Sequence, residues 1–141
     1  MARRLSLDLS LDEYPLALGI VSALPEYTLA FRLDKVLHTR LTLRGYYIAY
    51  NRRFKTSHKY LQYEYNHEEV FRFYRLVSNR SEDASLLLDD YGPLDYIFLV
   101  FGEISTGDVI HLKERLRGCQ GVEFVLEVYL DEKEHHELLV R

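Results

Sequence analysis

The sequence predicts a single α+β domain with a ferredoxin-like mixed sheet and two helices on one face of that sheet. Two nearly continuous apolar runs, 16–24 and 96–101, are typical of strands buried on both faces. Each run is followed by apolar residues at helical spacing, in 26–37 and 107–117. The remaining strands alternate apolar and polar residues, as expected near the edges of such a sheet.

The elements follow in chain order from these periods. Residues 5–11 place leucine at every second position, which is typical of an edge strand. The apolar strand 16–24 comes next, and Pro25 suits the first turn of the following helix because proline has no N–H to satisfy there. Helix 26–37 leads into an alternating strand, 41–50, in which Gly45 predicts a bulge.

The middle of the chain predicts a hairpin over 59–77, with its turn at 66–69. A polar loop over 79–92 follows, and its three successive leucines, 86–88, predict a short helix. Strand 96–101 comes after this loop.

The last helix and strand carry clear end signals. Ser105 or Thr106 predicts the N-cap of helix 107–117, and Gly118 predicts a left-handed C-terminal cap. Strand 122–130 alternates cleanly. The order is βαβ, hairpin, βαβ, so we expect strands 16–24 and 96–101 to be adjacent, parallel and central, with both helices on the same face.

The chain of 141 residues fits one domain, with 1–14 as an N-terminal extension or edge strand and 131–141 as a flexible tail. The single cysteine, Cys119, excludes an internal disulfide. Acidic residues follow the N-terminal arginines where a signal peptide needs an apolar stretch, and no apolar run is long enough to span a bilayer. These features indicate a cytoplasmic protein.

Charge is unevenly distributed along the chain. Residues 32–80 contain 11 Lys and Arg but 4 Asp and Glu, a net charge of +7, although the whole chain carries −4. The rest of the chain carries −11. Such an asymmetry predicts a charge-polarised surface that steers partners.

The basic part of the chain is also rich in tyrosine, and the protein has 12 tyrosines in all. Tyr and Arg are enriched at protein interfaces. This composition predicts a non-enzymatic module that docks a protein partner, or a second copy of itself, through a Tyr/Arg-rich sheet face. The predicted partner-binding residues are Arg44, Tyr46, Tyr47, Arg52, Arg53, Lys59, Tyr60, Arg72 and Tyr74.

The alternative is an RNA-binding accessory protein that uses segment 44–75. Cations interleaved with flat rings bind single-stranded nucleic acid through phosphate neutralisation and base stacking. A steep loss of affinity with salt would favour RNA over a mostly apolar protein interface.

Candidate catalytic and metal-binding groups each have a simpler explanation. His136 opens a near match to the HExxH zinc motif, but Val140 stands where the second histidine is required. Cys119 follows a predicted helix C-terminus, where the dipole disfavours a thiolate. Glu103 and Asp108 flank a turn in which helix capping uses the same residue types. We therefore expect no enzyme activity, no metal and no cofactor.

Three segments carry a resemblance to a known family. They are 27–34, Leu76-Val-Ser-Asn-Arg80, and Asp95-Tyr96 at the start of an apolar strand. With them, the chain from about Leu16 to Val140 resembles the IPExxxVDY family of short bacterial proteins. In the stretch that aligns with the naming motif, 119–127, Val125 is the clean match. The resemblance implies a fold and brings no catalytic residues.

One further expectation concerns the face of the sheet opposite the helices. Strand 96–101 does not alternate, so both faces of the sheet centre are apolar, and a large bare apolar patch is unusual for a soluble monomer. The cover could be 1–14, the 79–92 loop or a second chain, and the sequence favours a second chain.

Overall fold

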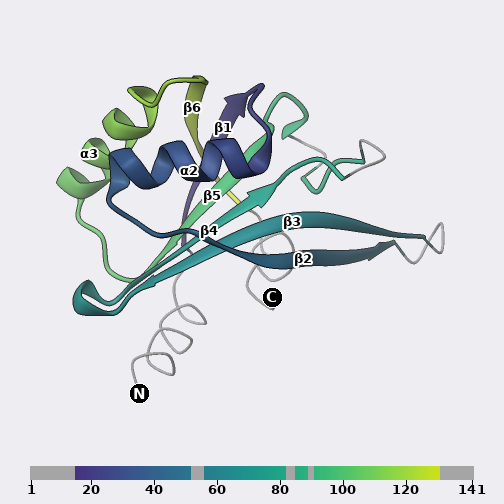
Figure 1. Ribbon diagram of the computed structural model, residues 1–141, viewed down its shortest axis with the longest axis horizontal. Coiled ribbons are helices and arrows are strands. Elements are labelled where there is room, and N and C mark those ends of the chain that lie inside the picture. Colours follow the sequence, from purple (N-terminus) through teal and green to yellow (C-terminus); the bar gives the residue numbers. More distant parts are fainter. Residues whose placement is uncertain (1–14, 52–55, 82–84, 89–90, 131–141) are drawn as a thin grey trace.

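The computed structural model describes residues 15–51, 56–81, 85–88 and 91–130 (Figure 1). The predicted N-terminal extension, 1–14, and the predicted tail, 131–141, lie outside the described residues. The elements, in chain order, are β1 (Leu16–Ser22), α2 (Glu26–Leu37), β2 (Thr42–Asn51), β3 (Thr56–His67), the 3₁₀ turn η1 (Glu68–Val70), β4 (Arg72–Ser78), β5 (Tyr96–Phe101), α3 (Thr106–Arg117) and β6 (Val122–Val128).

The strands form one six-stranded antiparallel sheet in the order β2-β3-β4-β5-β1-β6. This confirms the α+β class and the adjacent, central placement of β1 and β5. The prediction of a mixed sheet with a parallel central pair is wrong, because the chain reverses three times between β2 and β5 and so brings β5 back antiparallel to β1. The strand order is not ferredoxin-like, since β2 and β3 extend the sheet by a hairpin.

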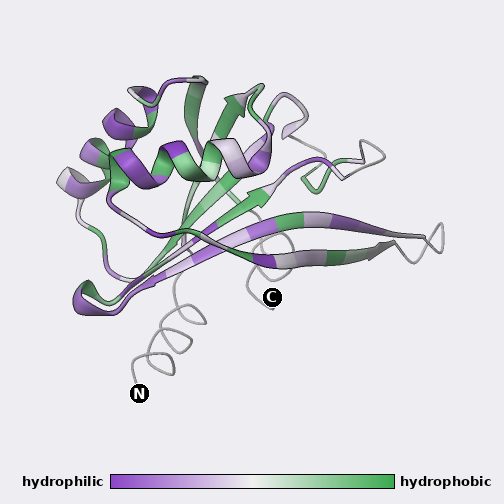
Figure 2. Cartoon of the chain, viewed as in Figure 1, coloured by the Kyte–Doolittle hydropathy of each residue, from purple (hydrophilic) through white to green (hydrophobic). Residues whose placement is uncertain are grey.

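The two helices cover one face of the sheet, as predicted (Figure 1). Leu29 and Leu33 of α2 join Leu112 and Leu116 of α3 in one core with the side chains of the central strands. The central strands contribute Leu18, Ile20, Leu76, Phe98 and Val100. Figure 2 shows the same distribution, with β1 and β5 strongly apolar and the outer side of α3 polar.

The opposite face of the sheet centre is covered by the chain itself. Leu88 and Leu94, from the connection between β4 and β5, are each 2% exposed and pack with Ala17, Ile97 and Leu99. Leu94 lies against Gly19, where any Cβ would collide with it. The expectation of a cover was therefore correct, but this connection supplies it over the centre, where the sequence favoured a second chain.

The side chain of Asn79 forms hydrogen bonds with three backbone groups of this connection. Asn79 is fully buried, its side-chain amide donates to the carbonyls of Tyr91 (3.1 Å) and Leu94 (2.9 Å), and its oxygen accepts from the Leu88 N–H (2.8 Å). The Asn79 side chain thus satisfies main-chain polar groups of Leu88, Tyr91 and Leu94. The short helix predicted at residues 86–88 is absent, and Leu86 instead forms an isolated bridge with Arg80.

A second polar junction lies nearby, at the start of β5. Asp95 accepts from the backbone N–H of Ser22 (2.9 Å) and from Nε of Arg80 (3.2 Å), while Tyr96 donates its hydroxyl proton to the Leu24 carbonyl. Asn79, Arg80, Asp95 and Tyr96 all belong to the segments that carry the family resemblance. In this structure they hold loops onto the sheet.

The helix ends agree with the sequence in part. Ser105 caps α3 through a capping box with Asp108, as predicted. Pro25 is the N-cap of α2 and precedes its first turn. Gly118 has φ −80°, which is a right-handed conformation, so the predicted left-handed cap is wrong.

Candidate functional site

The predicted partner-binding residues do not form one surface. Tyr47, Tyr60 and Tyr74 are 7%, 2% and 9% exposed, so they belong to the core. Arg52 and Arg53 lie outside the described residues. The remaining four fall into two separate places: Arg44, Tyr46 and Lys59 on strands β2 and β3, and Arg72 beside α3.

We call strands β2 and β3 together the β2–β3 wing, because Figure 1 shows this hairpin reaching away from the helix layer. Leu43, Tyr46 and Ile48 of β2 are 52%, 44% and 54% exposed. Their cross-strand partners on β3 are Tyr63, Leu61 and Lys59, which share one face of that strand. Tyr63 packs against the core under the helices, so all three side chains of β2 lie on the helix side of the sheet. The wing therefore carries an exposed apolar patch beyond the reach of the helices.

The bulge at Gly45 places Leu43 on the same face of β2 as Tyr46 and Ile48. Leu43 and Tyr46 are three residues apart, which would place them on opposite faces of a regular strand. The register shifts between Leu43 and Gly45, and Gly45 has φ +112°, a conformation that L side chains rarely adopt. The extra residue returns both side chains to the same face, so the bulge predicted from the sequence is confirmed and builds the patch.

The exposed charge of the wing is positive. Lys59 Nζ lies 5.6 Å from the centroid of the Tyr46 ring, and Arg44 is exposed over two-thirds of its side chain. Glu64 is the one acidic residue in these two strands. It contacts Arg44 Nε at 3.1 Å and the buried Arg75 Nε at 2.8 Å.

Glu64 is the carboxylate partner of the buried Arg75. Arg75 is 7% exposed, and its guanidinium lies 5.4 Å and 5.5 Å from the rings of Phe73 and Phe101. Burial lowers the pKa of Arg75, and the neighbouring Glu64 opposes that shift. A buried cation without its carboxylate is costly, so Glu64 serves the interior while Arg44 and Lys59 face solvent.

The outer edge of the wing is an unpaired strand edge. β2 runs for 10 residues and, within the described parts of the chain, pairs with β3 alone. Alternate N–H and C=O groups along β2 therefore have no sheet partner there. Such an edge is a ready template for an added strand.

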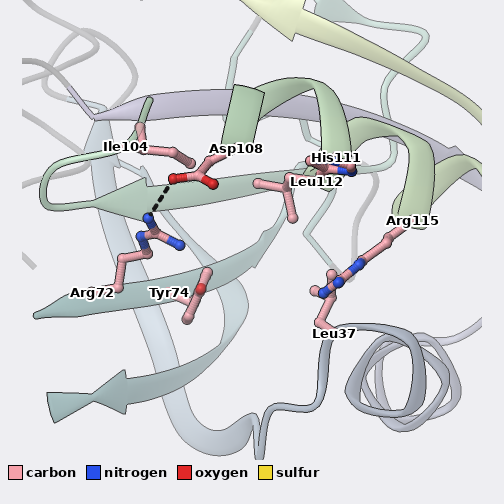
Figure 3. A pocket seen from close by; sticks show the side chains of 8 residues that line it. All are labelled: Leu37, Arg72, Tyr74, Ile104, Asp108, His111, Leu112 and Arg115. Carbon is pink, nitrogen blue, oxygen red and sulfur yellow. Dashed lines mark hydrogen bonds and ion pairs between the residues drawn. The ribbon is translucent and has the colours of Figure 1, made fainter. Parts of the chain in front are cut away.

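The second place lies between β4, the end of α2 and α3 (Figure 3). Arg72 Nη2 is 3.0 Å from Asp108 Oδ2, and a pocket of about 170 Å³ opens beside this ion pair. Hydrogen bonds from the Ser105 side chain and backbone, followed by Arg72, hold the pKa of Asp108 below its usual range. A wider groove next to it includes Val70, Phe71 and Glu103.

The groups considered for catalysis have structural roles or are not described. Asp108 belongs to the capping box, and Glu103 accepts from Arg72 through its backbone carbonyl. Cys119 is 3% exposed, and burial raises the pKa of its thiol. His135 and His136 lie outside the described residues. Among residues 15–51, 56–81, 85–88 and 91–130, no group of three or more His, Cys, Asp or Glu side chains is arranged to hold a metal ion.

No protein-family model matches the sequence. No curated protein matches it either. The resemblance to the IPExxxVDY family therefore stays a prediction. Of the helices in the described segments, none is long and apolar enough to cross a membrane.

Proposed function

We propose that this protein is a non-enzymatic interaction module that docks a partner protein on the β2–β3 wing. One observation carries the proposal: the unpaired edge of β2 runs beside exposed apolar side chains and exposed cations. An added strand gains main-chain hydrogen bonds from such an edge, and the side chains beside it select the partner. One cysteine in 141 residues is typical of a reducing compartment, so we place this activity in the cytoplasm.

The charges of the wing favour an acidic partner over a second copy. Arg44 and Lys59 are exposed on the wing, and the sequence between its two strands adds Arg52, Arg53 and Lys55. Two wings paired edge to edge would bring together the like charges of Arg44 and Lys59, which costs free energy. An extended segment rich in Asp and Glu meets no such repulsion.

The arrangement gives less support to RNA. Binding of single strands without sequence preference relies on exposed rings on which bases stack. Tyr47, Tyr60 and Tyr74 are buried, which leaves Tyr46 as the exposed ring among the four predicted tyrosines. Of these four tyrosines, therefore, one ring is open to base stacking on the wing.

Site-specific photo-crosslinking tests the proposal. Ile48 and Ile110 are matched positions, 54% and 52% exposed, but Ile110 lies on α3, away from the wing. A photo-reactive phenylalanine replaces each in turn, and crosslinking is performed in lysate of the source cells with and without nuclease. We expect one protein, identified by mass spectrometry, to crosslink at position 48 but not 110, independently of nuclease.

A charge-reversal variant makes this test specific. Lys59→Glu, combined with the crosslinker at position 48, should reduce the yield of that adduct several-fold, because Lys59 is the exposed cross-strand neighbour of Ile48 and its charge reversal repels an acidic partner. Equal crosslinking at both positions contradicts the proposal. Adducts that consist of nucleic acid and vanish after nuclease treatment would support the RNA-binding alternative instead.

A further inference from the structure

The pocket beside Arg72 lies apart from the wing and has its own chemistry. Leu37 at the end of α2 and Leu112 on α3 supply apolar walls, together with Ile104 from the loop before α3. Figure 3 shows Arg72 and Tyr74 on β4 at one side of the pocket, and Arg115 on α3 at the other side, where its side chain lies beside Leu37. Cationic groups and an aromatic hydroxyl thus surround a small apolar hollow.

Tyr74 is the most informative residue in this pocket. Its side chain is nine-tenths buried, and its ring stacks on Phe98 and Tyr65 at centroid distances of 5.8 Å and 6.2 Å. No hydrogen bond to its hydroxyl is found in the described part of the chain. The hydroxyl oxygen itself is not enclosed, since Gln62 Oε1 is the buried side-chain oxygen that lacks a partner among the described residues, so the Tyr74 hydroxyl is open to a ligand in the pocket.

The cations differ in how firmly they are held. Arg72 is fixed by Asp108 and by the Glu103 carbonyl, which Nε and Nη2 approach at 3.4 Å. These contacts occupy Nε and Nη2 and leave Nη1 uncommitted. Arg115 forms no ion pair or hydrogen bond among the described residues. With Asp108 as the carboxylate in the wall, the two arginines leave a net positive charge.

Besides Tyr74, the ionisable groups that line the pocket are Arg72, Asp108, His111 and Arg115. His111 lies at the mouth with its ring nitrogen 3.8 Å from Glu114, so it adds positive charge only when it is protonated. Asp108 is neutralised by Arg72 and engaged with Ser105. The free donors are thus the Tyr74 hydroxyl, Arg72 Nη1 and the Arg115 guanidinium, and a carboxylate accepts from donors of these types.

We propose that this pocket binds a small carboxylate with a short aliphatic body. The carboxylate accepts from Tyr74 and the two arginines, and the aliphatic part lies against Leu37, Ile104 and Leu112. The pocket has a volume of about 170 Å³ and opens to solvent, so a short carboxylate such as butyrate is a suitable probe for it. The same chemistry could come from a free acid or from the C-terminal residue of a peptide.

Titrating the full-length protein with butyrate tests this proposal, and the NMR signals of the Ile104 and Leu112 methyl groups report binding. Butyrate is the probe, butylammonium is the control of opposite charge, and inorganic phosphate is the control without an aliphatic body. We expect saturable binding of butyrate in the millimolar range, since ligands of this size have few atoms with which to gain affinity. Both controls should bind at least about tenfold more weakly, a difference of about 1.4 kcal/mol.

Three variants locate the site. Tyr74→Phe removes one hydroxyl and keeps the stacked ring, and Arg115→Met removes one guanidinium, so each should weaken butyrate about tenfold. Arg117→Met is the matched control, because Arg117 is on the same helix but points to the Val125 carbonyl at 3.4 Å. Shifts that never saturate, equal binding of butylammonium, or unchanged affinity in Tyr74→Phe and Arg115→Met would each overturn the proposal.

N-acetylvaline distinguishes the two sources of the carboxylate. It presents the end of a peptide, so tighter binding of N-acetylvaline than of butyrate assigns the pocket to a chain terminus. Tighter binding of butyrate assigns it to a free acid. Either result supports a carboxylate site, and neither affects the β2–β3 wing.

Discussion

Phe98 shows how strongly single residues are constrained at the centre of the sheet. It is fully buried on β5, and its ring lies against Tyr74 of β4. Phe98→Ala should lower the free energy of unfolding by about 3–5 kcal/mol, because it leaves a cavity where the sheet packs on both helices. Chemical denaturation measures this loss.

Phe124 provides the control for that measurement. It is a phenylalanine of β6 that is 56% exposed, so Phe124→Ala should cost about 1 kcal/mol or less. Equal losses in the two variants would contradict the placement of β5 at the centre of the core.

The tyrosines show where the sequence was least informative at this scale. Tyrosine is amphipathic, so its spacing fits a buried strand and an exposed one equally well. Tyr46 and Tyr47 are adjacent, yet 44% of one and 7% of the other is exposed. Which of the two faces inward depends on the bulge at Gly45 and on what covers each face, and neither can be decided from tyrosine content.

At the scale of elements, α3 offers a test that depends on pH. The Ser105–Asp108 capping box and the ion pair with Arg72 keep the pKa of Asp108 below its ordinary value of 3.8. Folding therefore favours the ionised carboxylate. Its stabilisation is present above about pH 4 and is lost as the pH falls through the folded-state pKa.

Asp108→Asn should consequently lower the melting temperature at neutral pH, and the difference from wild type should shrink below about pH 4. Thermal unfolding between about pH 2 and pH 7 measures it. In a Ser105→Ala background the effect of Asp108→Asn should be smaller at every pH, because the cap that Asp108 completes is already broken. A difference that grows as the pH falls would contradict this assignment.

Most elements were predictable because their signals are local. The continuous apolar runs identified β1 and β5, the helical spacing identified α2 and α3, and Ser105 marked a helix start. The direction of β5 was not predictable in the same way, because strand direction depends on how many reversals the chain makes between distant strands. The apolar period of a strand is the same in parallel and antiparallel sheets that are buried on both sides.

At the scale of the whole molecule, ion pairs join the basic part of the chain to the acidic remainder. Arg72 pairs with Asp108, and Arg80 pairs with Asp95, so two cations from 32–80 are neutralised across the fold. Arg75 is neutralised internally by Glu64. The net charge of +7 in that segment thus overstates its unpaired positive charge. In the described part of the segment, Arg44 and Lys59 are exposed on the β2–β3 wing, and Lys35 and Arg40 are exposed outside it.

The layered sheet also predicts how stability is distributed. All six residues of β5 are buried between two strand neighbours, whereas β2 has one neighbour among the described residues. Backbone amides of β5 and β1 should therefore exchange hydrogen most slowly, and β2 should show a period of two, with amides bonded to β3 protected and outward amides exposed. Native-state hydrogen exchange followed by NMR measures both.

The outward amides of β2 also report on what pairs with the wing. In the isolated protein they should exchange fast at every protein concentration, because like charges oppose the pairing of two wings. Protection that rises with protein concentration would instead mean that β2 pairs with a second copy. Protection as strong as that of β5 at the lowest concentration would mean that the edge of β2 is already covered within the chain, and the wing would then lose the feature on which its proposed docking role depends.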